Sequence, residues 1–196
     1  MRKHALCEEL TKHLTRCRNY AIPWTGVAYR SASVRYANRN DLLTGLGARR
    51  LGARWNPPRS IATVYASLEV ATAVQEALAH HRYYELGIEN ALPRVLVSIR
   101  VELKKVLNLA DANVRRTLGV TRQQLVREDW RAANEKNQEA FTQAIGRLAW
   151  IAGWQALLVP SMPYPGGVNL VIFPDNLPAL GSSLHIINAD ELPAPP

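Results

Sequence analysis

Side chains suited to an anionic, ring-bearing ligand are concentrated in one short loop of this 196-residue chain. The segment Gly52–Pro58 places Arg54, Trp55 and Asn56 beside two prolines, which restrict the backbone. A guanidinium group can bind a phosphate through two parallel hydrogen bonds, and an indole ring can stack on a planar ligand. The simpler interpretation of the same loop is a turn in which Trp55 fills the core.

A carboxylate and three hydroxyl groups follow along the chain. Tyr65 and Ser67 end a predicted strand, and Ser67 is a suitable N-cap for the next helix. Glu76 lies in the middle of that helix, off its main apolar stripe, which is typical of an exposed residue but also suits a carboxylate that faces a ligand. Ser161 lies in the loop Pro160–Gly167, which prolines and glycines punctuate.

The excess of positive charge lies entirely in the first third of the chain. The formal net charge is +8, and residues 1–60 hold twelve Lys and Arg against three acidic residues. The other residues are close to neutral. Such a field attracts anions, so nucleic acid, a phosphate-bearing small molecule and an acidic protein are all candidate partners, beside a merely solvated basic surface.

Several common kinds of site are excluded by spacing. There is no G-x-x-x-x-G-K-[ST] loop, no G-x-G-x-x-G fingerprint, no H-E-x-x-H pair and no G-x-S-x-G elbow. The two cysteines, Cys7 and Cys17, form no C-x-x-C pair, so we expect free thiols and no metal site. No apolar stretch is long enough to span a membrane and no signal peptide is recognisable, so a cytoplasmic protein is expected.

The apolar pattern predicts an α+β single domain with strands that do not alternate regularly with helices. In the helix at 68–84 the predicted core stripe is Val70, Val74, Ala77, Leu78 and His81. Asp111 and Thr121 are predicted N-caps, and Thr121 with Gln124 fits a capping box. The predicted helices are 4–17, 68–84 and 135–152, and the last of these lies within a helical stretch at 111–152. The predicted strands are 26–30, 62–66, 95–103, 155–159, 168–173 and 184–187. Residues 38–60 are predicted to be mostly loop, with a turn of helix at 40–45, and residues 192–196 to be a frayed tail.

The order of the short motifs resembles the RES domain family. That family is named for an arginine, a glutamate and a serine, which here are Arg30, Glu76 and Ser161. The resemblance covers about residues 26–176. The motifs that carry it are Tyr29-Arg30, Gly52–Pro58, Val64–Ser67 with Glu76, Leu158–Ser161 and Gly167–Pro174.

Two departures from the family pattern are visible. The family usually has Gly-Gly before Arg-Trp-Asn, whereas this chain has Gly52-Ala53, and Arg59 stands where a glycine is frequent. The segment 104–150 is also longer than in compact members. We therefore expect three parts: an N-terminal helical extension (1–25), the RES domain (26–176) with a helical insertion at about 105–152, and a C-terminal strand and tail (177–196).

The resemblance implies a fold similar to ADP-ribosyltransferase toxins, with a mixed sheet core and flanking helices. It implies a toxin of a bacterial type II toxin–antitoxin system that depletes NAD+ by hydrolysis or phosphorolysis of the nicotinamide–ribose bond. NAD+ is then a substrate, inorganic phosphate a candidate co-substrate, and no prosthetic group is expected. The implied partner is an Xre-like helix-turn-helix antitoxin, with a dimer inside the complex and nucleic acid contacted only through the antitoxin.

The chemistry of that bond assigns roles to the matching residues. The transition state resembles an oxocarbenium ion and favours a carboxylate near the ribose, so Glu76 would bind the ribose hydroxyls or orient the incoming nucleophile. Glu76 and Arg30 are the candidate catalytic residues. Arg30 and Arg54 match the family's arginines and would bind the pyrophosphate, and Tyr65 would form a wall for the nicotinamide ring. Ser161 would hydrogen-bond to NAD+. The remaining candidate NAD+-binding residues are Trp55, Asn56, Ser67 and Asn169.

Two other functions compete with this one. A mono-ADP-ribosyltransferase would use the same site but modify a protein. A basic nucleic-acid-binding module would explain the charge, but the aromatic residues do not alternate with Lys and Arg as a stacking platform requires, and no helix-turn-helix or zinc-finger pattern is present.

Overall fold

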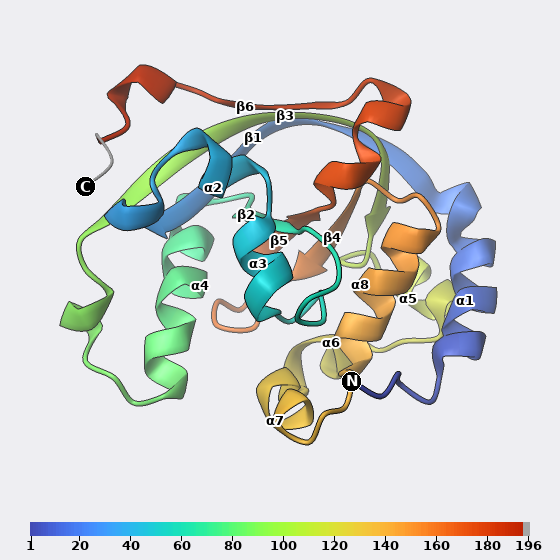
Figure 1. Cartoon of the computed structure of the whole chain (residues 1–196). Coiled ribbons are helices and arrows are strands. Elements are labelled where there is room, and N and C mark those ends of the chain that lie inside the picture. The colour runs from blue at the N-terminus through green and yellow to red at the C-terminus, as the bar shows by residue number, and fades with distance from the viewer. Residues whose placement is uncertain (194–196) are drawn as a thin grey trace.

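Alternating apolar residues predict a strand over 95–103, and β3 (Arg94–Asn108) occupies that position in the computed structural model, which describes residues 1–193. Its buried side chains include Val97, Ile99 and Val101. β3 pairs along most of its length with the antiparallel strand β1 (Ala21–Ser33). Figure 1 shows these two long strands arching together over the shorter ones. Part of the predicted frayed tail, residues 194–196, lies outside the described residues.

Six strands form one mixed sheet in the order β1-β2-β5-β4-β3-β6. The four shorter strands are β2 (Val64–Ser67), β4 (Ala156–Pro160), β5 (Val168–Ile172) and β6 (Ser183–Ile186). Only the β3–β4 pairing is parallel. Because β1 pairs with both β2 and β3, five of the strands close into a ring. The predicted mixed sheet with flanking helices is confirmed.

β1 is longer than the predicted strand at 26–30 and includes Pro23, which we expected to end regular structure. The pairing register against β3 shifts between Ile22 and Trp24. Pro23 has no backbone N–H to donate, and this irregular point of the ladder tolerates it. The prediction failed because it treated this proline as the end of regular structure.

The segment expected to be mostly loop contains two short helices, α2 (Arg39–Leu43) and α3 (Leu46–Leu51). The Asn38 side chain accepts a hydrogen bond from the backbone N–H of Asp41 and so caps α2. Gly45 separates the two helices with a positive φ of 71°, a conformation that glycine adopts easily. The prediction of loop at 46–51 was wrong because it gave too much weight to the glycines.

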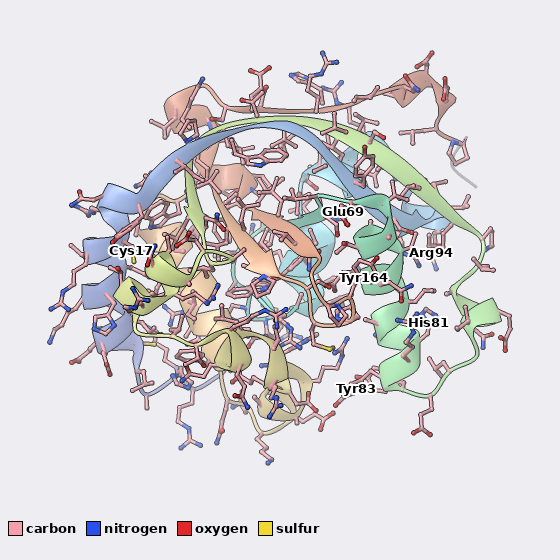
Figure 2. All side chains as sticks on the ribbon, turned by 180° about the vertical axis from the view of Figure 1, so that it is seen from behind. Cys17, Glu69, His81, Tyr83, Arg94 and Tyr164 are labelled. Carbon is pink, nitrogen blue, oxygen red and sulfur yellow. The ribbon has the colours of Figure 1, made fainter. Side chains whose placement is uncertain are left out.

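Helix α4 (Val70–Tyr83) buries a different face from the one its apolar residues predict (Figure 2, where Glu69 and Tyr83 mark its ends). Val70 and Val74 are 42% and 38% exposed, whereas Thr72 and Ala73 are buried. The small side chains let the helix lie close against β1, β2 and β5. This rotation turns Glu76, which is on the buried side, toward the sheet.

The predicted helical stretch at 111–152 consists of four helices. Asp111 caps α5 (Ala112–Leu118), and Thr121 with Gln124 forms the predicted capping box of α6 (Arg122–Arg127). The helix predicted from 135 begins later, because residues 137 and 139 hydrogen-bond to Arg2 through the backbone. The two remaining helices are α7 (Trp130–Glu135) and α8 (Phe141–Ile151).

The larger of two apolar cores lies between the sheet and the helices α1 (Cys7–Arg16), α5 and α8 (Figure 1). Leu10 and Leu14 of α1 are almost completely buried in it, together with Trp154 and Phe173. The second core lies inside the arch of β1 and β3. The N-terminal helix thus packs into the same core as α8.

Gly146 of α8 marks the closest approach of this helix to the Gly52–Pro58 loop. A Cβ at this position would lie 1.9 Å from the carbonyl oxygen of Trp55. We expect Gly146→Ala to lower the free energy of unfolding by about 1–3 kcal/mol, because backbone must move to make room. Urea denaturation would measure the change.

Gly47→Ala is the matched control, because a Cβ there meets no atom within 4 Å in helix α3. Alanine is the better helix former, so this variant should be unchanged or more stable by up to about 1 kcal/mol. Equal effects of the two substitutions would contradict the packing described here.

Candidate active site

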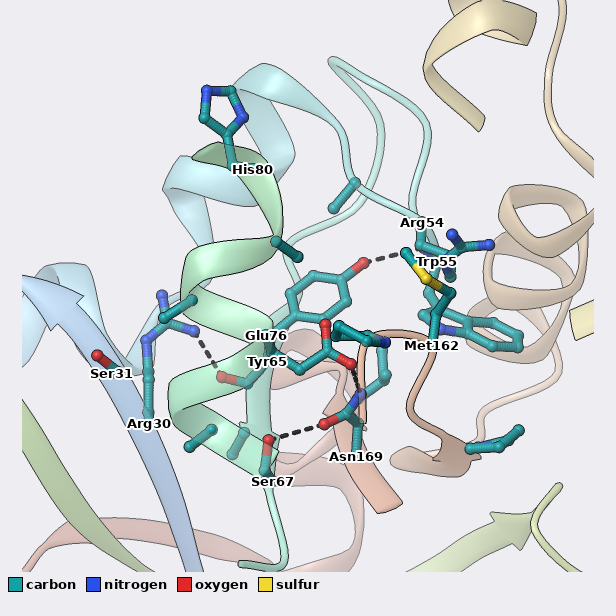
Figure 3. Close-up of a pocket in the computed structure, with 18 of the residues that line it drawn as sticks. Arg30, Ser31, Arg54, Trp55, Tyr65, Ser67, Glu76, His80, Met162 and Asn169 are labelled. Carbon is teal, nitrogen blue, oxygen red and sulfur yellow. Dashed lines mark hydrogen bonds between the residues drawn. The ribbon is translucent and has the colours of Figure 1, made fainter. Parts of the chain in front are cut away.

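A cavity of about 290 Å³ lies between β1, β2, the middle of α4, the Gly52–Pro58 loop and the Pro160–Gly167 loop (Figure 3). Its size is close to the lower limit of typical small-molecule sites. Most of the residues singled out from the sequence line it or lie directly behind its lining. Those that line it are Arg30, Arg54, Trp55, Tyr65, Ser67, Glu76 and Asn169.

The carboxylate of Glu76 is held from two sides. Its Oε1 atom accepts hydrogen bonds from Ser161 Oγ at 2.8 Å and from Asn169 Nδ2. The Ser161 hydroxyl in turn accepts from the backbone N–H of Tyr164 at 3.2 Å. Within the described residues no hydrogen bond is made to Oε2, so this oxygen is available to a ligand.

The register of the sheet places the partners of Glu76. Ser67 of β2 and Asn169 of β5 are directly paired, and Ser67 Oγ donates to Asn169 Oδ1 at 2.7 Å. The Asn169 amide is thereby oriented with its NH₂ group toward Glu76, since a carboxylate only accepts hydrogen bonds. The predicted N-cap role of Ser67 is wrong: α4 begins after Glu69, and the Ser67 hydroxyl orients Asn169 instead.

Arg30 is a partly buried cation without a carboxylate in hydrogen-bond contact. Its Nη1 donates to the carbonyl oxygen of Tyr65 at 2.9 Å, and its buried Nε has no hydrogen-bond partner within the described residues. Burial, and to a smaller extent the positive charge of Arg94, lower the pKa of Arg30 to about 10. A buried charge without a counter-ion is costly, so the site favours a ligand that brings negative charge.

Arg54 extends the positive charge to the opposite side of the cavity. Its Nη1 donates to the carbonyl oxygen of Glu128 at 3.0 Å. Burial lowers the pKa of Arg54, and the carboxylates of Glu76 and Glu128 oppose this effect. Both family arginines thus line the same cavity as Glu76.

The ring of Tyr65 is fixed as a wall of the cavity by its hydroxyl group. The hydroxyl donates to Asn56 Oδ1 at 2.8 Å and accepts from the backbone N–H of Trp55 at 3.0 Å. Burial raises the pKa of Tyr65 above its ordinary value. Figure 3 shows the ring beside Glu76.

Trp55 lines the cavity and Asn56 lies behind its lining, and both hold the surrounding loop in place. Trp55 is only 2% exposed and packs in the larger core, as the simpler interpretation of the loop predicts. Asn56 is completely buried and does not line the cavity; its Nδ2 donates to the carbonyl oxygen of Ala48 at 2.8 Å. We therefore assign these two side chains to holding the loop and Tyr65 in place.

Sequence reasoning missed several lining residues, above all Trp130 and Arg131 of α7. The Arg131 guanidinium lies 4.4 Å from the ring centroid of Trp130 and 4.5 Å from that of Tyr83 at the end of α4. Tyr83 also donates a hydrogen bond to Asp129 Oδ2 at 2.8 Å. In the sequence, only the adjacent pair Trp130-Arg131 could have indicated this part of the site. Its role becomes clear only when the structure shows that α7 faces α4.

A model of the RES domain family matches residues 27–195. The chain belongs to the RES domain family. It is 29% identical over 153 residues to the NAD(+) phosphorylase MbcT of Mycobacterium tuberculosis and to that of Mycobacterium bovis, which covers 77% of this chain and 74% of each relative.

A crystal structure of the M. tuberculosis MbcT–MbcA toxin–antitoxin complex has the same fold. It matches with a TM-score of 0.74 and 26% identity, over 94% of this chain and 92% of the other. The family and the fold predicted from the motifs are confirmed.

Two further structural findings concern residues 1–193. No helix there is long and apolar enough to cross a bilayer. This part of the chain contains no cluster of three or more His, Cys, Asp or Glu side chains that could hold a metal ion.

The support of Tyr65 can be tested through stability. Tyr65→Phe leaves the Trp55 N–H and the Asn56 Oδ1 without a partner, so we expect the free energy of unfolding to fall by about 1–3 kcal/mol. Urea denaturation would measure it. The control is Tyr29→Phe, because the Tyr29 hydroxyl makes no hydrogen bond within the described residues; a loss as large in this variant would contradict the assignment.

Proposed function

We propose that this protein is the toxin of a bacterial toxin–antitoxin pair and that it cleaves the nicotinamide–ribose bond of NAD+. The observation that carries the proposal is the carboxylate of Glu76, oriented by Ser161 and Asn169 in a cavity that also holds the unpaired cation of Arg30. Its relatives named NAD(+) phosphorylase support phosphate as the acceptor of ADP-ribose. We place the reaction in the cytoplasm, where this substrate is found.

The geometry suits a transition state with positive charge on the ribose. Nicotinamide leaves as a neutral molecule, so bond cleavage needs little help from an acid, and the developing oxocarbenium ion needs a nearby negative charge. Oε2 of Glu76 provides that charge or binds the ribose hydroxyls. Arg30 and Arg54 bind the diphosphate, and the ring of Tyr65 borders the nicotinamide.

The same proposal includes a protein partner. The structural neighbour was crystallised as a toxin–antitoxin complex, which supports an antitoxin for this chain as well. We propose an Xre-like helix-turn-helix antitoxin that assembles with the toxin into a complex containing a toxin dimer. Nucleic acid is then bound by the antitoxin.

Glu76→Gln is expected to lower the rate of NAD+ loss by at least about a hundredfold, because the amide carries no negative charge to stabilise the transition state. Nicotinamide release from purified protein would measure the rate. Glu69→Gln is the matched control: it makes the same chemical change at the start of the same helix, on an exposed residue outside the cavity. Full activity of the Glu76 variant would overturn the proposal.

The acceptor is identified by the product. With phosphate in the buffer we expect ADP-ribose 1″-phosphate, and its yield should rise with phosphate concentration. Chromatography would separate it from free ADP-ribose. Free ADP-ribose at every phosphate concentration would mean that water is the acceptor, and ADP-ribose attached to protein would indicate a transferase.

A further inference from the structure

A second cavity of about 440 Å³ adjoins the first, between α6, α7, the end of α4 and the Pro160–Gly167 loop. The two cavities have four lining residues in common: Arg54, Trp130, Arg131 and Met162. Figure 3 shows Arg54 and Met162 on the side of the first cavity that lies opposite Arg30. Ser161, which donates its hydrogen bond to Glu76, also lines the second cavity.

The second cavity is rich in arginine. Arg122 and Arg127 of α6 line it together with Arg54 and Arg131, against two acidic residues. The one salt bridge within the described residues joins Arg147 to Glu139, elsewhere in the fold. None of the four guanidinium groups is therefore neutralised by a carboxylate in direct contact.

The two acidic residues of the cavity are engaged by backbone N–H groups. The carboxylate of Glu128 accepts from the N–H groups of Phe141 and Thr142 at the start of α8, at 2.7 and 3.1 Å. The carboxylate of Asp129 accepts from Arg131 N and Ala132 N at the start of α7. Both carboxylates stabilise the starts of helices. They keep their negative charge, but the four arginines outnumber them, so the cavity has an excess of positive charge.

Part of this positive charge is also held in position. The Arg131 guanidinium contacts the rings of both Trp130 and Tyr83, at 4.4 and 4.5 Å from their centroids. Its side chain therefore loses little freedom when it binds a ligand. Arg122 and Arg127 are exposed at the rim, where they can move toward an incoming anion.

We propose that this second cavity binds a phosphate group, with Arg122 and Arg127 as ligands beyond the family motifs. The inference rests on the proposed function and deepens it. The phosphate has two possible sources: the inorganic phosphate that accepts ADP-ribose, or the diphosphate of NAD+. Arginine suits both, because its planar group binds two phosphate oxygens at once.

With inorganic phosphate as the ligand, the cavity supplies the nucleophile of the reaction. An oxygen of HPO₄²⁻ forms a bond to C1″ of the ribose, and the C1″–N bond to nicotinamide breaks. The electron pair of that bond goes to the nicotinamide nitrogen, which becomes neutral. Phosphate retains its proton, so no further reactant is needed.

The test replaces both rim arginines, Arg122→Gln with Arg127→Gln, and measures initial rates against each substrate. We expect the KM for one of the two substrates to rise about tenfold, the effect of losing charge-assisted hydrogen bonds. A rise in the KM for phosphate identifies the acceptor, and a rise in the KM for NAD+ identifies the diphosphate. A change of less than twofold in both overturns the inference.

A double variant that removes the same amount of positive charge elsewhere provides the control. Arg49 and Arg50 are exposed on α3 and line neither cavity, so Arg49→Gln with Arg50→Gln should leave both KM values unchanged. The same rise in this variant would show that overall charge, not the cavity, attracts the anion, and would also overturn the inference.

Direct binding measurements test the second cavity independently of the proposed reaction. Inorganic phosphate, and ADP-ribose as a diphosphate probe, are titrated against the Glu76→Gln protein by calorimetry, with and without the α6 substitutions. Wild-type protein that degrades no NAD+ would refute the proposed function, while loss of binding with the α6 substitutions would still support the site. Binding of both probes that is unaffected by the substitutions would refute the site.

Discussion

The site depends on one carboxylate held in a fixed orientation where α4 lies against the sheet. Glu76 can face inward only because the residues around it on the helix, such as Thr72 and Ala73, are small enough for close packing. Ser161 and Asn169 fix its orientation there by donating hydrogen bonds to one oxygen. The direct pairing of Ser67 with Asn169 between β2 and β5 then fixes the orientation of the amide.

Placing the other site residues around this carboxylate requires several chain segments to meet at the cavity. Arg30 comes from β1, Tyr65 from β2, and Ser161 from the loop after β4, and the ring of strands brings these three positions together. The Gly52–Pro58 loop is held by buried Trp55 and Asn56, which immobilise the Tyr65 hydroxyl. On the other side, α7 completes the wall with Trp130 and Arg131, and the contact of Arg131 with Tyr83 joins this helix to the end of α4.

Much of this could be predicted from the sequence, and the failures have physical reasons. Alternation predicted β3, local caps predicted α5 and α6, and ordered motifs predicted the family. The buried face of α4 could not be predicted, because exposed Val70 and Val74 looked like its core. Trp130 and Arg131 were missed because α7 has no motif of its own. Ser67 was predicted as a site residue, but its hydrogen bond to Asn169 was not, because the two residues are distant in sequence.

The most direct test is a crystal structure of the Glu76→Gln protein with NAD+. That substitution keeps the shape of the side chain while slowing the reaction. We predict that the nicotinamide ribose lies within hydrogen-bond distance of residue 76, with the nicotinamide beside Tyr65 and the diphosphate at the arginines. NAD+ bound elsewhere, or with its ribose far from residue 76, would contradict the central role of this carboxylate.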